Sequence, residues 1–166
     1  MKNKKNILTI YIPLILIAVL TVLTGFCRDF IFKNINALLK AWDFDMDFNI
    51  SPSLAFLENF EYDTLLEIKW ILTFIFSILY LIISLLVIKL IFKKRKYLMI
   101  TVGTYVGITF FSIIFMAIGH FFPGTSGKMY EFARYFMGMA QSPIILMILI
   151  PAFKLSEKEN NKRTTT

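Results

Sequence analysis

Few charged residues, one cysteine and one histidine are the first features of this 166-residue chain. Charged side chains make up 17% of it and hydrophobic ones 57%, whereas a soluble domain has roughly 25% and 45–50%. This balance excludes intrinsic disorder, which needs low hydrophobicity, and argues against a soluble enzyme. A single cysteine excludes an internal disulfide, so cysteine usage does not indicate the redox compartment.

The chain instead contains four long stretches without Asp, Glu, Lys or Arg, at residues 7–27, 70–88, 97–122 and 135–153. Each is close to the roughly 20 residues that an α-helix needs to cross a bilayer. Helices suit such stretches because backbone groups in lipid must bond within the segment. We therefore predict an all-α integral membrane protein, a single domain over residues 1–166 with four transmembrane helices. The spans are predicted at about 7–27, 70–92, 97–122 and 131–153.

The basic residues predict the orientation of these spans. With the N-terminus in the cytoplasm, the inner segments carry twelve Lys and Arg against two acids, and the outer segments six against nine. The positive-inside rule then places both termini in the cytoplasm, with the tail 154–166 inside and an outer loop of about 40 residues at 28–68. The formal net charge of +7 is thereby explained by topology and the anionic lipid surface, and we predict no nucleic-acid partner. Phe26 stands before Cys27 where a lipoprotein signal has a small residue, so we expect the first helix to be retained.

The predicted outer loop begins with apolar residues at helical spacing from Ile31 to Trp42. This spacing predicts an amphipathic helix at the outer interface, or equally a helix packed on the spans. Residues 43–50 alternate between polar and apolar, as in a short strand, and residues 58–69 indicate a helix leading into the second span.

Three carboxylates in this alternation, those of Asp43, Asp45 and Asp47, have the spacing with which a calcium loop begins. An EF-hand also needs glycine at its sixth position and glutamate at its twelfth, where this chain has Phe48 and Leu54. We therefore expect a solvated acidic edge here and predict no metal site.

Side chains able to do chemistry are scarce in the predicted spans. The first three contain no ionisable group at mid-depth other than tyrosine, which argues against an ion-coupled transporter. Cys27, His120 and Arg134 all fall near the predicted outer face, where a thiol, a base and a cation form a nucleophilic site if they are adjacent. A membrane thiol enzyme using these three is therefore an alternative, but we predict a non-enzymatic protein without cofactor.

Two patterns predict contacts between helices. Ser77 and Ser84 share one face of the second span, and Gly103 with Gly107 forms a small-xxx-small notch in the third. We expect both patterns to pack helices within the chain. A homodimer seam is the alternative for the glycine pair.

The fourth span carries a polar stripe of Tyr130, Arg134, Gly138 and Gln141. Pro143 follows it and cannot donate to the carbonyl of Met139, which predicts a kink or a local opening of the helix. Because lipid penalises polar side chains, we expect the stripe to face the bundle. A lipid or solute carrier with a cavity at the kink is a further alternative. The residues predicted to contact a partner are Arg28, Trp42, Tyr130, Arg134, Gln141 and Pro143.

Three segments carry a resemblance to a known family: Arg-Asp-Phe-Ile-Phe at 28–32, the basic turn at 93–96, and the stretch 141–153 with two prolines eight residues apart. In these, the chain resembles the exosortase F–associated proteins of Bacteroidetes, which are short proteins of the bacterial inner membrane. The resemblance implies a non-enzymatic accessory of an exosortase-type protein-sorting system. It also implies binding to a larger, exosortase-like membrane partner or to its substrate.

Overall fold

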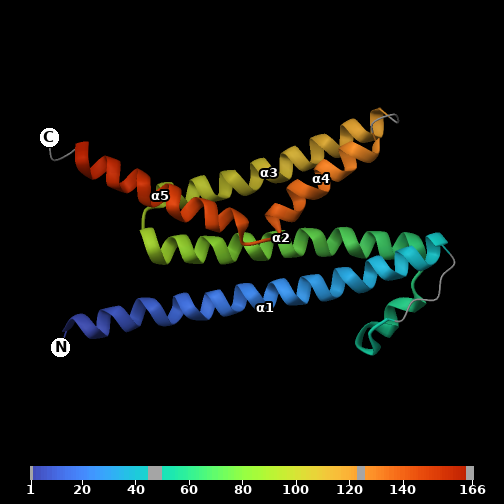
Figure 1. Ribbon diagram of the computed structural model, residues 1–166, viewed down its shortest axis with the longest axis horizontal. Coiled ribbons are helices and arrows are strands. Elements are labelled where there is room, and N and C mark those ends of the chain that lie inside the picture. Colours follow the sequence, from blue (N-terminus) through green and yellow to red (C-terminus); the bar gives the residue numbers. More distant parts are fainter. Residues whose placement is uncertain (1, 45–49, 123–125, 164–166) are drawn as a thin grey trace. The chain divides into compact units, whose positions relative to one another are not determined.

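All elements in the computed structural model are helices, and it describes residues 2–44, 50–122 and 126–163 (Figure 1). They are listed from the N-terminus as α1 (Lys2–Phe44), the 3-10 helix η1 (Pro52–Asn59), α2 (Tyr62–Phe92), α3 (Arg95–Phe121), α4 (Ser126–Ala140) and α5 (Ile144–Arg163). No strand occurs in the described residues, which confirms the all-α prediction.

Three helices are long and apolar enough to cross a membrane, with candidate spans at Ile12–Asp43, Tyr62–Phe92 and Arg95–Phe121. A fourth span exists if the bent pair Gly127–Ala140 and Ile144–Asn160 crosses as one unit; its two helices meet at 62°. The protein is therefore a multi-pass membrane protein with three to four spans. Pro143 stands at the bend, where the kink was predicted.

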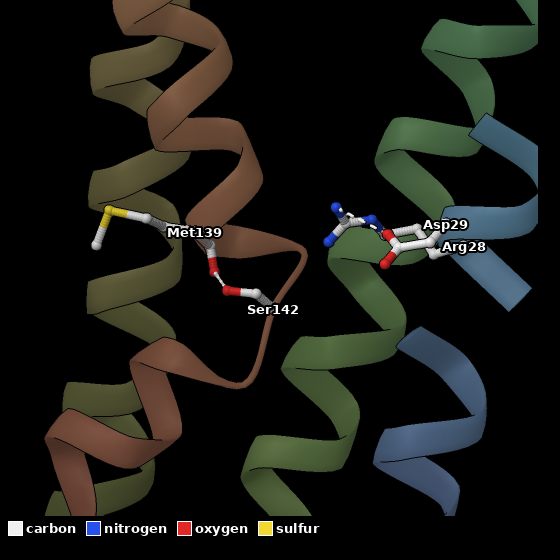
Figure 2. A network of polar contacts seen from close by, with 4 residues as sticks. All are labelled: Arg28, Asp29, Met139 and Ser142. Carbon is white, nitrogen blue, oxygen red and sulfur yellow. Dashed lines mark hydrogen bonds and ion pairs between the residues drawn. The ribbon is translucent and has the colours of Figure 1, made fainter. Parts of the chain in front are cut away.

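The first helix is much longer than predicted. Residues 28–44, assigned to an outer loop, continue α1 without interruption. The helix predicted from Ile31 to Trp42 is confirmed, but it is not a separate element, and its apolar residues pack in the core of unit 2. Charged residues are compatible with a helix, and at the start of this stretch Arg28 Nη2 and Asp29 Oδ1 pair at 3.2 Å (Figure 2). Low hydropathy marks where a chain leaves lipid, whereas a helix ends only where its backbone hydrogen bonds end.

The remainder of the predicted loop also differs. Asp43 and Phe44 belong to α1, and the rest of the predicted strand up to Asn49 lies outside the described residues. The helix expected over 58–69 is interrupted: η1 ends at Asn59, and α2 begins at Tyr62, eight residues before the predicted span.

The chain divides into two compact units. Unit 1 comprises Met1–Ile17 and Ser77–Thr166, and unit 2 comprises Ala18–Phe76. In unit 2 the core lies where α1, η1 and the start of α2 meet, and its buried residues are Ile35, Leu38, Leu39, Leu57 and Leu65. Asn34 joins two of these segments: its Nδ2 donates to the carbonyl of Phe30 at 2.8 Å, and its Oδ1 accepts from the backbone N–H of Ser51 at 3.1 Å.

Unit 1 has its aromatic core where α2 turns into α3. Lys93 makes this turn with φ of 54°, in the left-handed region. The rings of Phe92 and Tyr97 lie 5.1 Å apart, and Phe153 of α5 packs on both. Lys94 Nζ also pairs with Glu157 Oε1 at 2.7 Å. The bent pair α4–α5 thus returns along α3 to the end of unit 1 from which α3 starts (Figure 1).

Candidate functional site

The break between α4 and α5 interrupts the helical hydrogen bonding of unit 1 at residues 141–143. Because Pro143 has no N–H, the carbonyl of Met139 accepts instead from the backbone N–H of Ser142 at 3.2 Å and from its Oγ at 2.9 Å (Figure 2). The helix resumes when the N–H of Met147 donates to the carbonyl of Pro143 at 3.0 Å. Local bonds therefore satisfy the groups that the proline displaces.

Gln141 lies within this break and is only 6% exposed. Its backbone N–H donates to the carbonyl of Met137 at 3.1 Å, which closes the last turn of α4. Gln141 is thus part of the interior of unit 1, as expected for the polar stripe.

The other half of the stripe does not face the interior. Tyr130 is 49% exposed and Arg134 is exposed, so the expectation that they face the bundle is wrong. The face of α4 that packs on α3 instead carries Ala133, whose carbonyl accepts from Ser112, and Phe136, whose ring stacks on Phe115. Small and apolar residues set the orientation of α4, and this orientation turns Arg134 outward.

Buried hydroxyls connect the helices of unit 1. Ser77 Oγ donates to Met137 Sδ at 3.7 Å, and Ser112 Oγ donates to the carbonyl of Ala133 at 2.8 Å. Ser84 Oγ and Tyr105 Oη lie 2.9 Å apart. Among described residues, no buried side-chain nitrogen or oxygen lacks a hydrogen-bond partner. These groups hold the helices of unit 1 together.

The glycine notch has a different environment from these serines. A Cβ added at Gly103 or Gly107 would meet nothing within 4 Å, and Gly103 is exposed. This face of α3 therefore makes no close contact with the described chain.

The three candidates for nucleophilic chemistry are divided between the two units. Cys27 is an exposed free thiol in unit 2, whereas His120 and Arg134 belong to unit 1. His120 packs edge-on against Phe121, with ring centroids 5.7 Å apart. No hydrogen bond connects its ring to Arg134 in the described part of unit 1.

An open hollow of about 210 Å³ lies beside His120 and is lined by Met116, Gly119, His120 and Tyr130. Its apolar walls and open form provide no convergent polar groups of the kind that fix a substrate. The described residues also contain no group of three or more His, Cys, Asp or Glu able to hold a metal ion. Asp45 and Asp47 lie outside the described residues.

The remaining predicted contact residues lie in unit 2. Arg28 is paired with Asp29, and Trp42, near the end of α1, is 58% exposed. Phe56 of η1 is 57% exposed and was missed, because its segment was expected to be an ordinary loop. Helical spacing around the 3-10 helix was the only signal that could have identified it.

A second feature missed from the sequence is the outward side of α4. We define the α4 outer face as Gly127, Glu131, Arg134 and Gly138, which repeat at intervals of four, three and four residues. Such intervals place side chains on one side of a helix. This side therefore contains Arg134 and Gly138 of the predicted stripe together with Gly127 and Glu131, which were not part of it. Gln141 of the stripe lies beyond the end of α4.

No protein-family model, curated protein or solved structure matches the chain. The class that its fold defines is an all-helical, multi-pass membrane protein.

Proposed function

We propose that the protein is a non-enzymatic accessory subunit of an exosortase-type sorting system in the bacterial inner membrane. It binds a larger membrane protein, or that protein's substrate, through unit 2. The observation that carries this proposal is that two large aromatic side chains of unit 2 beyond the predicted span 7–27, Trp42 of α1 and Phe56 of η1, are more than half exposed. Tryptophan is enriched among the residues that dominate the energy of protein interfaces, and exposed apolar groups mark such surfaces.

Buried polar groups are satisfied, and the described residues contain no metal-ligating cluster. The resemblance at residues 28–32, 93–96 and 141–153 supplies the exosortase assignment. An exosortase gene beside this one in the genome would support the same assignment independently.

Site-specific photo-crosslinking in the native membrane tests the proposal. A crosslinking amino acid is placed at Trp42 or Phe56, and the matched control is Met99, which is 67% exposed on α3. We expect one larger polytopic membrane protein to crosslink from unit 2 and not from Met99. Mass spectrometry identifies it, and an exosortase-type protein is the expected result.

Substitution gives the complementary measurement. Trp42→Ala is expected to reduce co-purification of that partner in mild detergent by at least about tenfold, the size of a hot-spot effect. Recovery of the protein alone, under conditions that preserve other membrane complexes, would contradict the proposal.

A further inference from the structure

The α4 outer face carries two opposite charges between two glycines. Glu131 and Arg134 are exposed, as is Gly127, and Gly138 is half-buried. On the opposite side, α4 packs on α3: Phe115 stacks on Phe136 with ring centroids 5.5 Å apart, and Ser112 bonds to Ala133. The charged side of α4 is therefore the side that points away from α3.

The charges lie beside an apolar stretch of α3, well away from its end. The hydrogen bond between Ser112 and Ala133 sets the register of the two helices. Ser112 is nine residues before Phe121, so Arg134 lies about 13 Å along the axis from the end of α3. Since α3 is a candidate span and hydrocarbon is about 30 Å thick, these charges face lipid unless something covers them. Charged groups at that depth are costly and are normally paired.

The chain itself does not pair them. Glu131 and Arg134 are one helical turn apart, a spacing at which such residues commonly interact. Neither takes part in an ion pair among the described residues, where the pairs are Arg28 with Asp29 and Lys94 with Glu157. A Cβ added at Gly127 or Gly138 would meet nothing within 4 Å, so the face is also open to close approach by another helix.

We propose that the α4 outer face is a homodimer interface, in which Glu131 of each copy pairs with Arg134 of the other. A two-fold interface brings the same surface of both copies together, and it therefore requires a self-complementary surface. One anion and one cation on the same stripe meet this requirement. Two copies in one membrane have the same orientation. Glu131 of one copy and Arg134 of the other are therefore offset by about 4.5 Å along the helix axis, a distance that an arginine side chain can span. The four charges then neutralise each other.

The flanking glycines match the same geometry. Gly127 precedes Glu131 by four residues and Gly138 follows Arg134 by four, so the stripe lacks side chains at both ends. Small residues at such positions let the backbones of two membrane helices come close. The α3 glycines, Gly103 and Gly107, are also open, but α3 has no acidic residue that could pair with a cation of a second copy. They provide the matched control.

Charge reversal in the full-length chain tests the interface. Glu131→Arg makes both residues positive, and Arg134→Glu makes both negative. Each variant carries a different affinity tag, and the chains are reconstituted in liposomes with donor and acceptor fluorophores. We expect each variant alone to associate at least about tenfold more weakly than the original chain, because like charges across an interface are unfavourable. The two variants mixed should recover association, since positive then faces negative.

Several outcomes would overturn the proposal. One is an original chain that remains monomeric; another is association that persists in both single variants, as expected if Arg134 reaches lipid phosphates instead. A third is a mixture that fails to associate although circular dichroism shows both variants helical.

The glycines provide a second test. Gly138→Leu should weaken association and Gly103→Leu should not, and the reverse result would place the interface on α3. Crosslinking at Trp42 reports partner binding separately, because it probes unit 2.

Discussion

The hydroxyls of Ser84 in α2 and Tyr105 in α3 lie 2.9 Å apart, and Tyr105 Oη also donates to the carbonyl of Tyr80 at 3.3 Å. Both side chains are almost fully buried, so Ser84 has no water to replace a lost partner. A buried hydroxyl left without a partner is more costly than the bond itself is favourable. This pair therefore connects the two most apolar helices of the chain at a defined register.

Tyr105→Phe tests this connection. We expect it to lower the free energy of unfolding by about 1 kcal/mol, the size typical of hydrogen bonds between membrane helices. Ser84→Ala in the same background should add little, because its partner is already gone. Tyr135→Phe is the control, since Tyr135 is 73% exposed. Unfolding in mixed micelles gives the measurement, and equal effects of Tyr105→Phe and Tyr135→Phe would contradict the prediction.

Pro143→Ala is expected to straighten the bent pair α4–α5. An alanine N–H at this position can donate to the carbonyl of Met139, which now accepts from Ser142. Spin labels at Tyr135 and Ile148, in a Cys27→Ser background, measure the result: their separation should lengthen as the 62° bend opens. Pro151→Ala is the matched control, because Pro151 lies inside α5 without a break. An unchanged separation in Pro143→Ala would show that packing on α3 alone sets the bend.

Some of this architecture is predictable from composition, and the reasons for the rest are physical. The uncharged stretches locate α2 and α3 because lipid excludes charge, and Pro143 locates the break because it lacks a donor. Hydropathy does not report that α1 continues to Phe44, since helical hydrogen bonds form in water as in lipid. The direction of Arg134 depends on which side of α4 packs on α3. Ala133 and Phe136 decide that side through their contacts with Ser112 and Phe115, about 20 residues earlier in the sequence.

The ion pair between Lys94 and Glu157 predicts a pH-dependent effect at the α2–α3 turn. The hydrogen bond that Lys94 donates to the Glu157 carboxylate raises the pKa of Lys94 above its ordinary value of 10.5. Because the pKa is raised in the folded chain, the pair's stabilisation is fully present below pH 10.5 and is lost as pH rises through the folded pKa.

Glu157→Gln should lower the pKa of Lys94 toward its ordinary value, so that amine acylation at Lys94 becomes faster at pH 9 to about 10. Mass spectrometry of the labelled peptide measures this rate. Glu159→Gln removes an exposed acid two residues further along α5 and should leave the rate unchanged. The same faster acylation in both variants would indicate a general charge effect and contradict the pairing.

The same ion pair supports a prediction about membrane topology. Since α5 returns to the α2–α3 turn, we expect the bent pair to cross as one span and the C-terminus to lie on the side of the basic turn 93–96. The positive-inside rule predicts that this side is the cytoplasm. Alkaline phosphatase fused after residue 166 should therefore be inactive, and a fusion after residue 122 should be active. Activity at both positions would mean that α4–α5 does not cross.

Cys27→Ala distinguishes the proposed accessory subunit from the alternative, a membrane thiol enzyme. Cys27 is an exposed free thiol of α1, and none of the described contacts depends on its sulfur. An accessory subunit should therefore keep its crosslink at Trp42 in Cys27→Ala, and the same holds for His120→Ala. A thiol enzyme would lose all activity in the first variant, because no other residue can supply the nucleophile. Crosslink yield and sorting of the exported substrate, measured in the same cells, decide the matter: an intact crosslink with abolished sorting would establish the enzyme.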